Sequence, residues 1–386
     1  MNLLIHDLSA AEWAQIADNY KDWAVVSDNG TIRPCIGCFR CWAGGTGECV
    51  VQDGYNRMGA LIHEAEEMVV MSRYTYGGFS SFVKNVFDRS LGFVLPEFET
   101  VYGEMHHQKR YPEYKPVTFR FRGRGLTEED KEKARQYVAA VCRNLQGTVK
   151  DVIFDECAPE ESPAAHPDEP AVSPAVHPAA PADRSGLLFV SCSPRGKGSN
   201  TEVFLEKLQE DLGSSADLFS LSPGADLTKI AEAVGRAETV VIGIPLYVDG
   251  LPAAALRLME KVKELGSGDR CKLYAVVNNG LYESRQNVNM LNMLKGFCAE
   301  NGLEYRGAAA IGAGEVAGLL LRGKKRGLWP ARNARAALAS LAKAIAADKE
   351  LEDIYADPFL FPRWLYILIA NVNWQMLKRA ARKASR

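Results

Sequence analysis

The 386-residue chain lacks several features that would assign it to a simple class. Its formal net charge is only −2, so no strong overall field favours nucleic acid. It has no run of about 20 apolar residues, which argues against a transmembrane helix. Its N-terminus has neither the basic region nor the long apolar region of a signal peptide. With 47% hydrophobic and 24% charged residues, the composition is that of globular domains. We therefore expect a cytoplasmic protein that binds no nucleic acid.

A disulfide framework is also missing, although the chain has nine cysteines. An odd total with one tight cluster is typical of a reducing compartment. The cluster has the spacing C-x2-C-x2-C-x7-C and consists of Cys35, Cys38, Cys41 and Cys49. Thiolates are the ligands of iron–sulfur clusters and of structural zinc. The compact triad favours a [4Fe–4S] cluster over zinc, and metal-free thiols or a reversible disulfide remain the alternative.

The Pro/Ala-rich segment 157–185 divides the chain. It has almost no large apolar residues, so it cannot bury a core and is expected to be an extended linker. On both sides, apolar strands alternate with helices, which predicts parallel sheets covered by helices. We predict an α/β fold with two doubly wound domains, 1–156 and 186–345, and a C-terminal amphipathic helical tail at 346–386.

The two halves share an internal repeat. AEEMVVMSRYTYGGFSS from Ala65 aligns without gaps to AETVVIGIPLYVDGLPA from Ala237, so the repeats start 172 residues apart (237 − 65). A buried strand followed by a glycine turn is common, but the length of the match favours two copies of one domain.

The second half contains a loop suited to phosphate. An apolar strand at Leu187–Ser191 runs into SCSPRGKGSNT and then into a helix. Backbone N–H groups, hydroxyls and cations at a helix N-terminus bind a phosphate monoester. The loop matches neither the Walker motif nor G-x-G-x-x-G. The alternative is a solvated turn with a plain helix cap. The predicted phosphate ligands are Ser193, Arg195, Ser199, Asn200 and Thr201.

Two further loops follow strands of the same half, and in an open parallel sheet they border the same crevice. Their backbone amides and aromatic side chains suit a flat heteroaromatic ring, although the two tyrosines are equally consistent with ordinary packing. The predicted ring contacts are Pro245, Leu246, Tyr247, Val248 and Gly250 in one loop, and Asn278, Asn279, Gly280 and Tyr282 in the other.

SCSPRGKGSNT, IPLYVDGLP and NNGLYESRQN, with GAGE at 312–315, resemble the flavodoxin-like NAD(P)H-dependent FMN reductases. The resemblance covers most of residues 186–316. It implies FMN, with the phosphate in the Ser193–Thr201 loop and the ring against Pro245–Gly250 and the 278–282 loop.

The cysteine segment PCIGCFRCW, with Cys49, Asp53 and the later KNVFDR, is similar to the iron–sulfur flavoproteins and their flavodoxin-like relatives over residues 32–89. Many such relatives are simple flavin reductases, so the resemblance leaves the cluster open. The first strand departs from the pattern because it ends in HDLSAAEW, without a phosphate loop. Domain 1 is therefore expected to have lost its FMN phosphate site.

These features predict a tandem that mimics a two-fold dimer, with one flavin facing one cysteine cluster across the domain interface. The expected activity is that of an NAD(P)H-dependent FMN oxidoreductase. Electrons would pass to a small-molecule or protein acceptor, through a [4Fe–4S] cluster if one is bound. The sequence identifies no catalytic acid or base. The alternative function is a non-enzymatic electron carrier or redox sensor.

Three features are left over. His106 and His107 lie in a polar insertion that is expected to be an exposed loop. The alternating Arg120, Arg122 and Arg124 suit either the 2′-phosphate of NADPH or a solvated sheet edge. The tail has an apolar part followed by cations, and docking on the body or on a second subunit of a homodimer is favoured over weak membrane contact.

Overall fold

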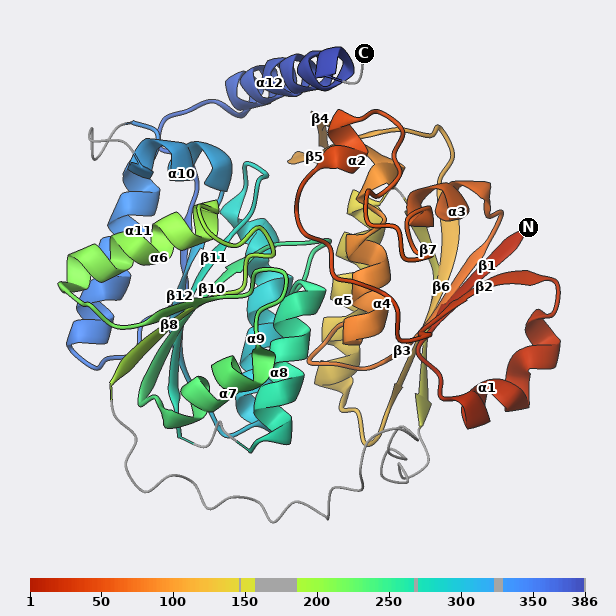
Figure 1. The fold of residues 1–386 in the computed structure, drawn as a ribbon, viewed down its shortest axis with the longest axis horizontal. Coiled ribbons are helices and arrows are strands. Elements are labelled where there is room, and N and C mark those ends of the chain that lie inside the picture. Colours follow the sequence, from red (N-terminus) through yellow and green to blue (C-terminus); the bar gives the residue numbers. More distant parts are fainter. Residues whose placement is uncertain (146, 157–185, 267–269, 323–328, 385–386) are drawn as a thin grey trace.

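The computed structural model describes residues 1–145, 147–156, 186–266, 270–322 and 329–384 (Figure 1). The segment predicted to be a linker, 157–185, lies outside the described residues. Within the described residues, each half forms its own parallel sheet, and a separate antiparallel hairpin lies between the halves and the C-terminal helix. No helix in this part of the chain is long and apolar enough to cross a membrane.

Domain 1 has the sheet order β2-β1-β3-β6-β7, with every neighbouring pair parallel. The strands are β1 (Asn2–His6), β2 (Trp23–Ser27), β3 (Met68–Arg73), β6 (Lys115–Gly123) and β7 (Gly147–Glu156), and β4 (Val94–Val101) and β5 (Glu104–Lys109) form the hairpin. The helices are α1 (Ala10–Ile16), η1 (Ala17–Tyr20), α2 (Arg40–Ala43), α3 (Met58–Glu64), α4 (Ser81–Asp88), η2 (Leu91–Phe93) and α5 (Glu128–Asn144).

Domain 2 has the order β13-β12-β11-β10-β8-β9, again parallel throughout. The strands are β8 (Leu187–Ser191), β9 (Leu218–Ser220), β10 (Thr239–Pro245), β11 (Lys272–Asn278), β12 (Glu304–Ile311) and β13 (Ile354–Ala356). The helices are α6 (Asn200–Leu212), α7 (Leu227–Arg236), α8 (Ala253–Glu264), η3 (Ser284–Asn287), α9 (Val288–Glu300), α10 (Gly314–Arg322), α11 (Arg332–Ala346) and α12 (Arg363–Ala384).

In chain order, the strands of domain 1 run 2-1-3-4-5, and those of domain 2 run 2-1-3-4-5-6. This is the flavodoxin-like doubly wound order, so the predicted fold class is confirmed. The central strands have nearly continuous apolar sequences because helices cover both faces of each sheet. In domain 2, α6 and α11 cover one face, while α8 and α9 cover the face turned toward domain 1 (Figure 1). Strand β13, from the predicted tail, pairs with β12 and extends the second sheet.

Equivalent helices of the two domains pack on each other, α4 against α8 and α5 against α9. The aligned glycines Gly78 and Gly250 both lie against the same pair, Tyr137 of α5 and Met293 of α9. Such pairing of like surfaces is the arrangement of an isologous two-fold interface. The internal repeat therefore has a counterpart in the packing of the two domains.

A buried ion pair fastens this interface. Lys84 is fully buried in α4 and bonds the carboxylate of Asp88 one turn later. The other carboxylate oxygen of Asp88 accepts a hydrogen bond at 2.9 Å from the backbone N–H of Ala253, the first residue of α8. A carboxylate at a helix N-terminus stabilises the unpaired N–H groups there. Domain 1 thus supplies a cap for a helix of domain 2.

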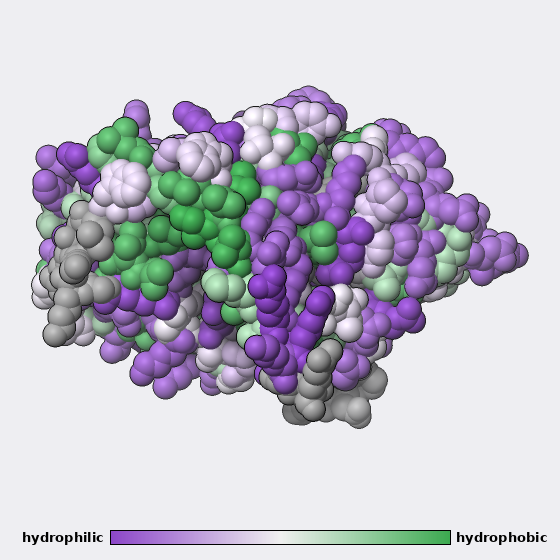
Figure 2. All heavy atoms as spheres, turned by 90° about the horizontal axis from the view of Figure 1, so that it is seen from above, coloured by the Kyte–Doolittle hydropathy of each residue, from purple (hydrophilic) through white to green (hydrophobic). Residues whose placement is uncertain are grey.

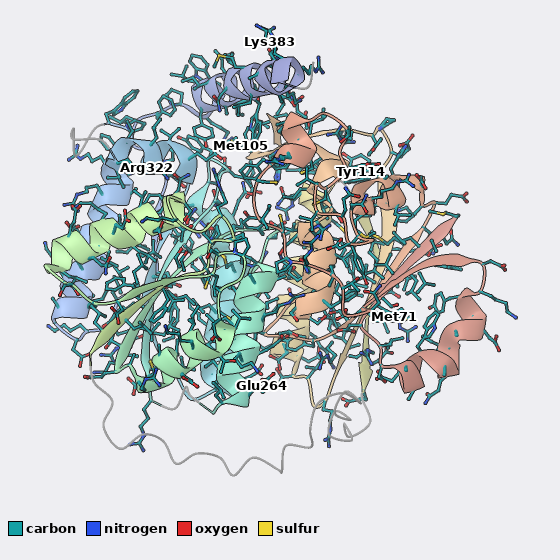
Figure 3. All side chains as sticks on the ribbon, in the orientation of Figure 1. Met71, Met105, Tyr114, Glu264, Arg322 and Lys383 are labelled. Atoms are coloured by element: carbon teal, nitrogen blue, oxygen red, sulfur yellow. The ribbon has the colours of Figure 1, made fainter. Side chains whose placement is uncertain are left out.

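The expectation of an exposed loop at residues 106–107 is wrong. Both histidines lie on β5, which pairs with β4, and His106 is only 3% exposed. The neighbouring Met105 donates from its N–H to Glu283 at 3.0 Å and accepts from Gln286 at 3.1 Å, so the hairpin is bonded to domain 2 (Figure 3). Tertiary partners pair part of the hairpin's polar groups, including the backbone of Met105 and Nδ1 of His106, and this favours their burial.

The arginines of β6 serve the sheet of domain 1. Arg120 forms a two-bond pair with Asp155, at 2.9 and 2.8 Å. Arg122 bonds Asp7 and Glu12. These guanidinium groups have intramolecular carboxylate partners, so they give no support for a 2′-phosphate site.

Candidate flavin site

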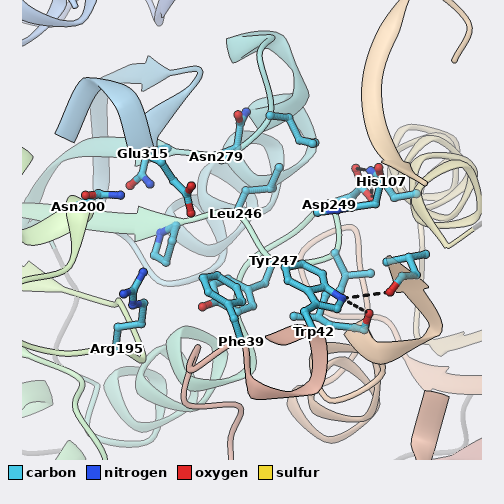
Figure 4. A pocket seen from close by; sticks show the side chains of 18 of the residues that line it. Phe39, Trp42, His107, Arg195, Asn200, Leu246, Tyr247, Asp249, Asn279 and Glu315 are labelled. Carbon is cyan, nitrogen blue, oxygen red and sulfur yellow. Dashed lines mark hydrogen bonds between the residues drawn. The ribbon is translucent and has the colours of Figure 1, made fainter. Parts of the chain in front are cut away.

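A pocket lies between the carboxyl ends of the domain 2 strands, the cysteine segment and hairpin of domain 1, and α12 (Figure 4). Its empty space, counting the part open to solvent, is about 1120 Å³. All the residues predicted to hold phosphate or ring line this pocket, except Gly250 and Tyr282. The three predicted loops, 193–201, 245–250 and 278–282, therefore converge on one cavity.

The loop Ser193–Thr201 connects β8 to α6 and meets the pocket at the start of the helix. Ser199 caps α6, since its hydroxyl oxygen accepts from the N–H of Glu202 at 3.2 Å. First-turn N–H groups such as those of Asn200 and Thr201 have no partner inside a helix. With the positive end of the helix dipole they favour an anion.

Arg195 supplies a cation at the boundary of the two domains. Its guanidinium carbon lies 5.5 Å from the ring centroid of Phe39, and its aliphatic stem packs at Gly37. Glu315, from the GAGE segment, also lines the pocket. Burial raises the pKa of Glu315, and the charge of Arg195 acts against that rise.

The loops after β10 and β11 are tied to the phosphate loop. Thr201 donates its hydroxyl to the side-chain oxygen of Asn278 at 2.8 Å, and the N–H of Leu246 donates to the carbonyl of Asn278 at 2.7 Å. These bonds set the relative positions of all three loops. Tyr247 is 9% exposed, and burial raises its pKa well above the usual value.

Asn279 lines the pocket and carries an unsatisfied acceptor. Its side-chain amide donates to the carbonyl of Glu283 at 3.0 Å, whereas its side-chain oxygen is buried and has no hydrogen-bond partner among the described residues. Buried polar atoms are normally paired. Asn279 lines the pocket, so the unpaired oxygen belongs to a residue of the pocket wall (Figure 4).

Two predicted ring contacts lie elsewhere. Tyr282 points away and donates its hydroxyl to the carbonyl of Phe361 at 2.6 Å, next to the ring of Tyr366. Gly250 lies at the domain interface, where an added Cβ would come 2.9 Å from Tyr137. Neither residue contacts the pocket. Tyr282 anchors the chain before α12, and Gly250 allows domain 1 to approach closely.

The turn after β10 is strained at the pocket. Val248 and Asp249 have φ of +39° and +58°, a region that β-branched residues rarely adopt. The equivalent turn in domain 1 contains Tyr76 and Gly77, where glycine takes the second position. Strain of this kind persists where the surroundings enforce it and concentrates at functional sites.

Asp249 also carries a buried carboxylate, 4% exposed, at the pocket wall. The side-chain amide of Asn144 donates to both its oxygens, at 2.7 and 2.8 Å. The side-chain oxygen of Asn144 in turn lies 2.6 Å from Nδ1 of His106. Burial raises the pKa of Asp249, opposed by the hydrogen bond from Asn144. A titratable group therefore faces the cavity at the end of a chain of hydrogen bonds from β5.

Aromatic side chains form the opposite wall, and the sequence reasoning missed them. The rings of Phe39 and Trp42 are stacked with centroids 5.2 Å apart (Figure 4). Trp374 of α12 meets Trp42 edge-on, with centroids 5.5 Å apart. His107 packs on Trp42 at 4.6 Å, and burial lowers its pKa to about 4. The imidazole is therefore neutral near pH 7. The missed lining residues include Phe39, Trp42, Phe98, His107, Asp249 and Trp374.

Arg89 organises the cysteine segment. Its five N–H donors reach five acceptors, which are the Sγ of Cys49 at 3.1 Å, the carbonyls of Arg33 and Val51, and both carboxylate oxygens of Asp53 at 2.8 and 3.0 Å. An arginine has five such donors and no more. Burial alone would raise the pKa of Asp53, but the hydrogen bonds, first that from Arg89, lower it to about 2.

The four clustered cysteines line one small hollow beside Asp88 and Arg89 and are free thiols. Burial raises the pKa of Cys35, and it raises that of Cys41 to about 12. Across the described ranges, no group of three or more His, Cys, Asp or Glu side chains is arranged to hold a metal ion. The predicted [4Fe–4S] ligand set therefore has no support in this arrangement.

No protein-family model matches the chain, and no curated protein matches it. Solved structures match part of it. The NAD(P)H:quinone oxidoreductase from Methanothermobacter marburgensis is 14% identical, with 43% of this chain and 96% of that chain covered, at a TM-score of 0.31. The azoreductase from Bacillus anthracis is 16% identical, with 42% and 98% covered, at 0.30. General stress protein 14 from Treponema denticola, solved with FMN, is 15% identical, with 41% and 99% covered, at 0.31. We draw no function from likenesses of this size.

Proposed function

We propose that the protein is an FMN-dependent NAD(P)H oxidoreductase with one flavin site, held by domain 2 and closed by domain 1 and α12. The observation that carries the proposal is the convergence of the three loops at 193–201, 245–250 and 278–282 on one cavity. They follow β8, β10 and β11, and ligands of open α/β sheets bind at the carboxyl ends of such strands.

The residues in the cavity match the parts of FMN in order. Ser193, Arg195 and the start of α6 would hold the phosphate, because they combine hydroxyls, a cation and unpaired N–H groups. Leu246 and Tyr247 would flank the ring, and the orphaned oxygen of Asn279 would accept from a ring N–H. In the described part of domain 1, β1 leads into α1 without such a loop, so no second site of this kind follows that strand.

When bound, FMN supplies hydride acceptance from NAD(P)H and onward transfer of electrons. The chain's own residues bind and orient the ring, and the wall of Phe39, Trp42 and Trp374 excludes water from it. That wall also offers aromatic surface to a planar ring, such as that of nicotinamide or of a small-molecule acceptor. The carboxyl of Asp249 would be the titratable group at the edge of the cavity.

The proposed function does not include electron transfer through a [4Fe–4S] cluster. The four cysteines share a hollow next to the pocket, but they do not form a metal-binding group in the described chain. We therefore route no electron transfer through a cluster. Iron and sulfide analysis after anaerobic purification tests this point separately, and stoichiometric iron with sulfide would overturn it.

Flavin binding and turnover test the proposal together. The purified chain should bind one FMN, with quenched flavin fluorescence, and oxidise NADH or NADPH in the presence of a quinone or free flavin. A protein that binds FMN but shows no steady-state turnover, and is reduced only by another protein, would be an electron carrier. A protein that binds no FMN at all would refute the assignment.

A further inference from the structure

The last helix, α12, is fastened to both domains along one side. At its N-terminal end Tyr366 donates its hydroxyl to the carbonyl of Gly280 in domain 2 at 2.8 Å. Farther along, Asn371 exchanges two hydrogen bonds with the backbone of Phe98 in β4, at 2.7 and 2.9 Å. Near the C-terminal end, Lys378 bonds Glu97. The helix therefore bridges the domains with a fixed inner face.

The outer face of α12 is apolar and has no partner among the described residues. Trp364, Leu368, Val372 and Met376 recur every four residues, which places them along one side of a helix. They are 67%, 54%, 48% and 55% exposed. Ile369 is also exposed, at 49%. We call these five residues the outer stripe. Single exposed apolar residues are normal, whereas a contiguous stripe marks an interaction surface.

Figure 2 looks down on the face of the molecule that carries α12 and shows hydrophobic residues gathered there beside hydrophilic ones. At the C-terminal end of α12, the cations Arg379 and Lys383 follow the outer stripe. The label of Lys383 in Figure 3 marks this end. The helix Arg363–Ala384 contains no Asp or Glu, although the whole chain has a net charge of −2.

The positive charge of α12 indicates which kind of partner covers the outer stripe. A second copy of the chain docked through α12 would bring another helix without carboxylates against the same cations, which is electrostatically unfavourable. An anionic lipid surface supplies both an apolar layer for the outer stripe and negative charge for the terminal cations. Trp364 at one end of the stripe is a residue type enriched at the membrane–water interface.

We propose that the outer face of α12 binds the surface of an anionic lipid bilayer, with the helix lying in the plane of the interface. The inner face stays on the protein, because the contacts of Tyr366, Asn371 and Lys378 occupy it. The protein would be held on the bilayer rather than inserted through it. The pocket wall at Trp374 and the bilayer would then lie on opposite sides of one helix. This inference does not depend on flavin binding.

Flotation of the full-length protein with vesicles tests the proposal. We expect binding to vesicles of phosphatidylcholine with phosphatidylglycerol, weak binding to phosphatidylcholine alone, and release at high salt. Val372→Glu, within the outer stripe, should abolish binding. Arg379→Glu with Lys383→Glu should weaken it by about fivefold or more for each cation removed. Val25→Glu, at an exposed valine of β2, is the matched control and should bind as the parent does.

Other results would overturn the proposal. These are equal binding to both kinds of vesicle, binding to neither, or unchanged binding of Val372→Glu. Sedimentation equilibrium tests whether a second copy of the chain covers the outer stripe instead. A dimer that dissociates in the Val372→Glu variant would assign the stripe to the second copy. Circular dichroism spectra and melting temperatures of the variants show that they are folded, so a loss of flotation reports on the surface itself.

Discussion

Gly37 of the cysteine segment lies directly against the hydroxyl of Tyr247 in the loop after β10. A Cβ added at Gly37 would come 2.5 Å from Tyr247 Oη and 2.7 Å from Cγ of Arg195. Because Gly37 has no side chain, the segment that carries the cysteines can pack directly against two residues of the proposed flavin site. The close approach explains how domain 1 closes a pocket whose ligand-binding loops belong to domain 2.

Gly37→Ala should weaken FMN binding by about tenfold or more, because the methyl group would push Tyr247 and Arg195 from their positions. Gly37 has φ of +61°, so backbone strain contributes as well. Gly45→Ala separates the two effects, since Gly45 has φ of +81° and no heavy atom within 4 Å of an added Cβ. Flavin fluorescence titration measures both variants. Equal losses of affinity would mean that strain, and not the contact with Tyr247, is responsible.

Arg195→Ala should lower the affinity for FMN by about tenfold, as expected for the loss of one charge-assisted hydrogen bond. The affinity for riboflavin, which lacks the phosphate, should change little. Lys197→Ala is the control, because Lys197 is an exposed cation of the same loop that does not line the pocket. Isothermal titration with both ligands distinguishes the outcomes. An equal loss for riboflavin would place Arg195 at the ring and not at the phosphate.

Asp249→Asn should make the protein more stable relative to the parent as the pH rises. Burial raises the pKa of this carboxyl in the folded state, so the folded protein binds more protons than the unfolded chain between the two pKa values. The parent loses stability as the pH rises through that window, by about 1.4 kcal/mol for each unit of pKa shift, and the amide does not. Melting temperatures from pH 4 to 8, about the range in which such groups titrate, measure the difference. A constant difference across the range would contradict this assignment.

Asp53→Asn should change the pH dependence of stability in the opposite direction to Asp249→Asn. The pKa of Asp53 is lowered to about 2, so its contribution to stability is present above the ordinary pKa of a carboxyl and is lost as the pH falls toward 2. At neutral pH the variant leaves the buried guanidinium of Arg89 without its carboxylate, at a cost of roughly 3 to 5 kcal/mol. Denaturant unfolding at neutral and acidic pH tests this. A variant as stable as the parent at neutral pH would show that the pair is dispensable.

The sequence was sufficient for the fold and for half of the site. The strands and the loops at their ends follow from local apolar runs and glycine turns, and three loops that end parallel strands must meet at one edge. Asp249 lies inside the predicted loop Pro245–Gly250 but is not among the predicted ring contacts. The internal repeat could have pointed to Asp249, because the aligned position in domain 1 is a glycine, Gly77, and an aspartate in its place is unusual.

The other half of the pocket could not be predicted, because it depends on contacts between distant segments. Trp42 and Trp374 come from opposite ends of the chain and meet only through the docking of α12. No local pattern in the sequence shows that Asn144, Glu283 and Gln286 will bond to the polar hairpin, so its polar residues predict an exposed loop. The spacing of the cysteines likewise gives no sign that Arg89 will donate to the Sγ of Cys49.

The central claim is that one flavin binds between the two domains, with its phosphate in the Ser193–Thr201 loop. Extraction and quantification of flavin from the protein after reconstitution with FMN tests it most directly. The account predicts one FMN per chain for the parent and less than half an equivalent for a Ser193→Ala, Arg195→Ala, Thr201→Ala triple variant that keeps its melting temperature. A parent protein that retains no flavin, or a triple variant that retains a full equivalent, would contradict it.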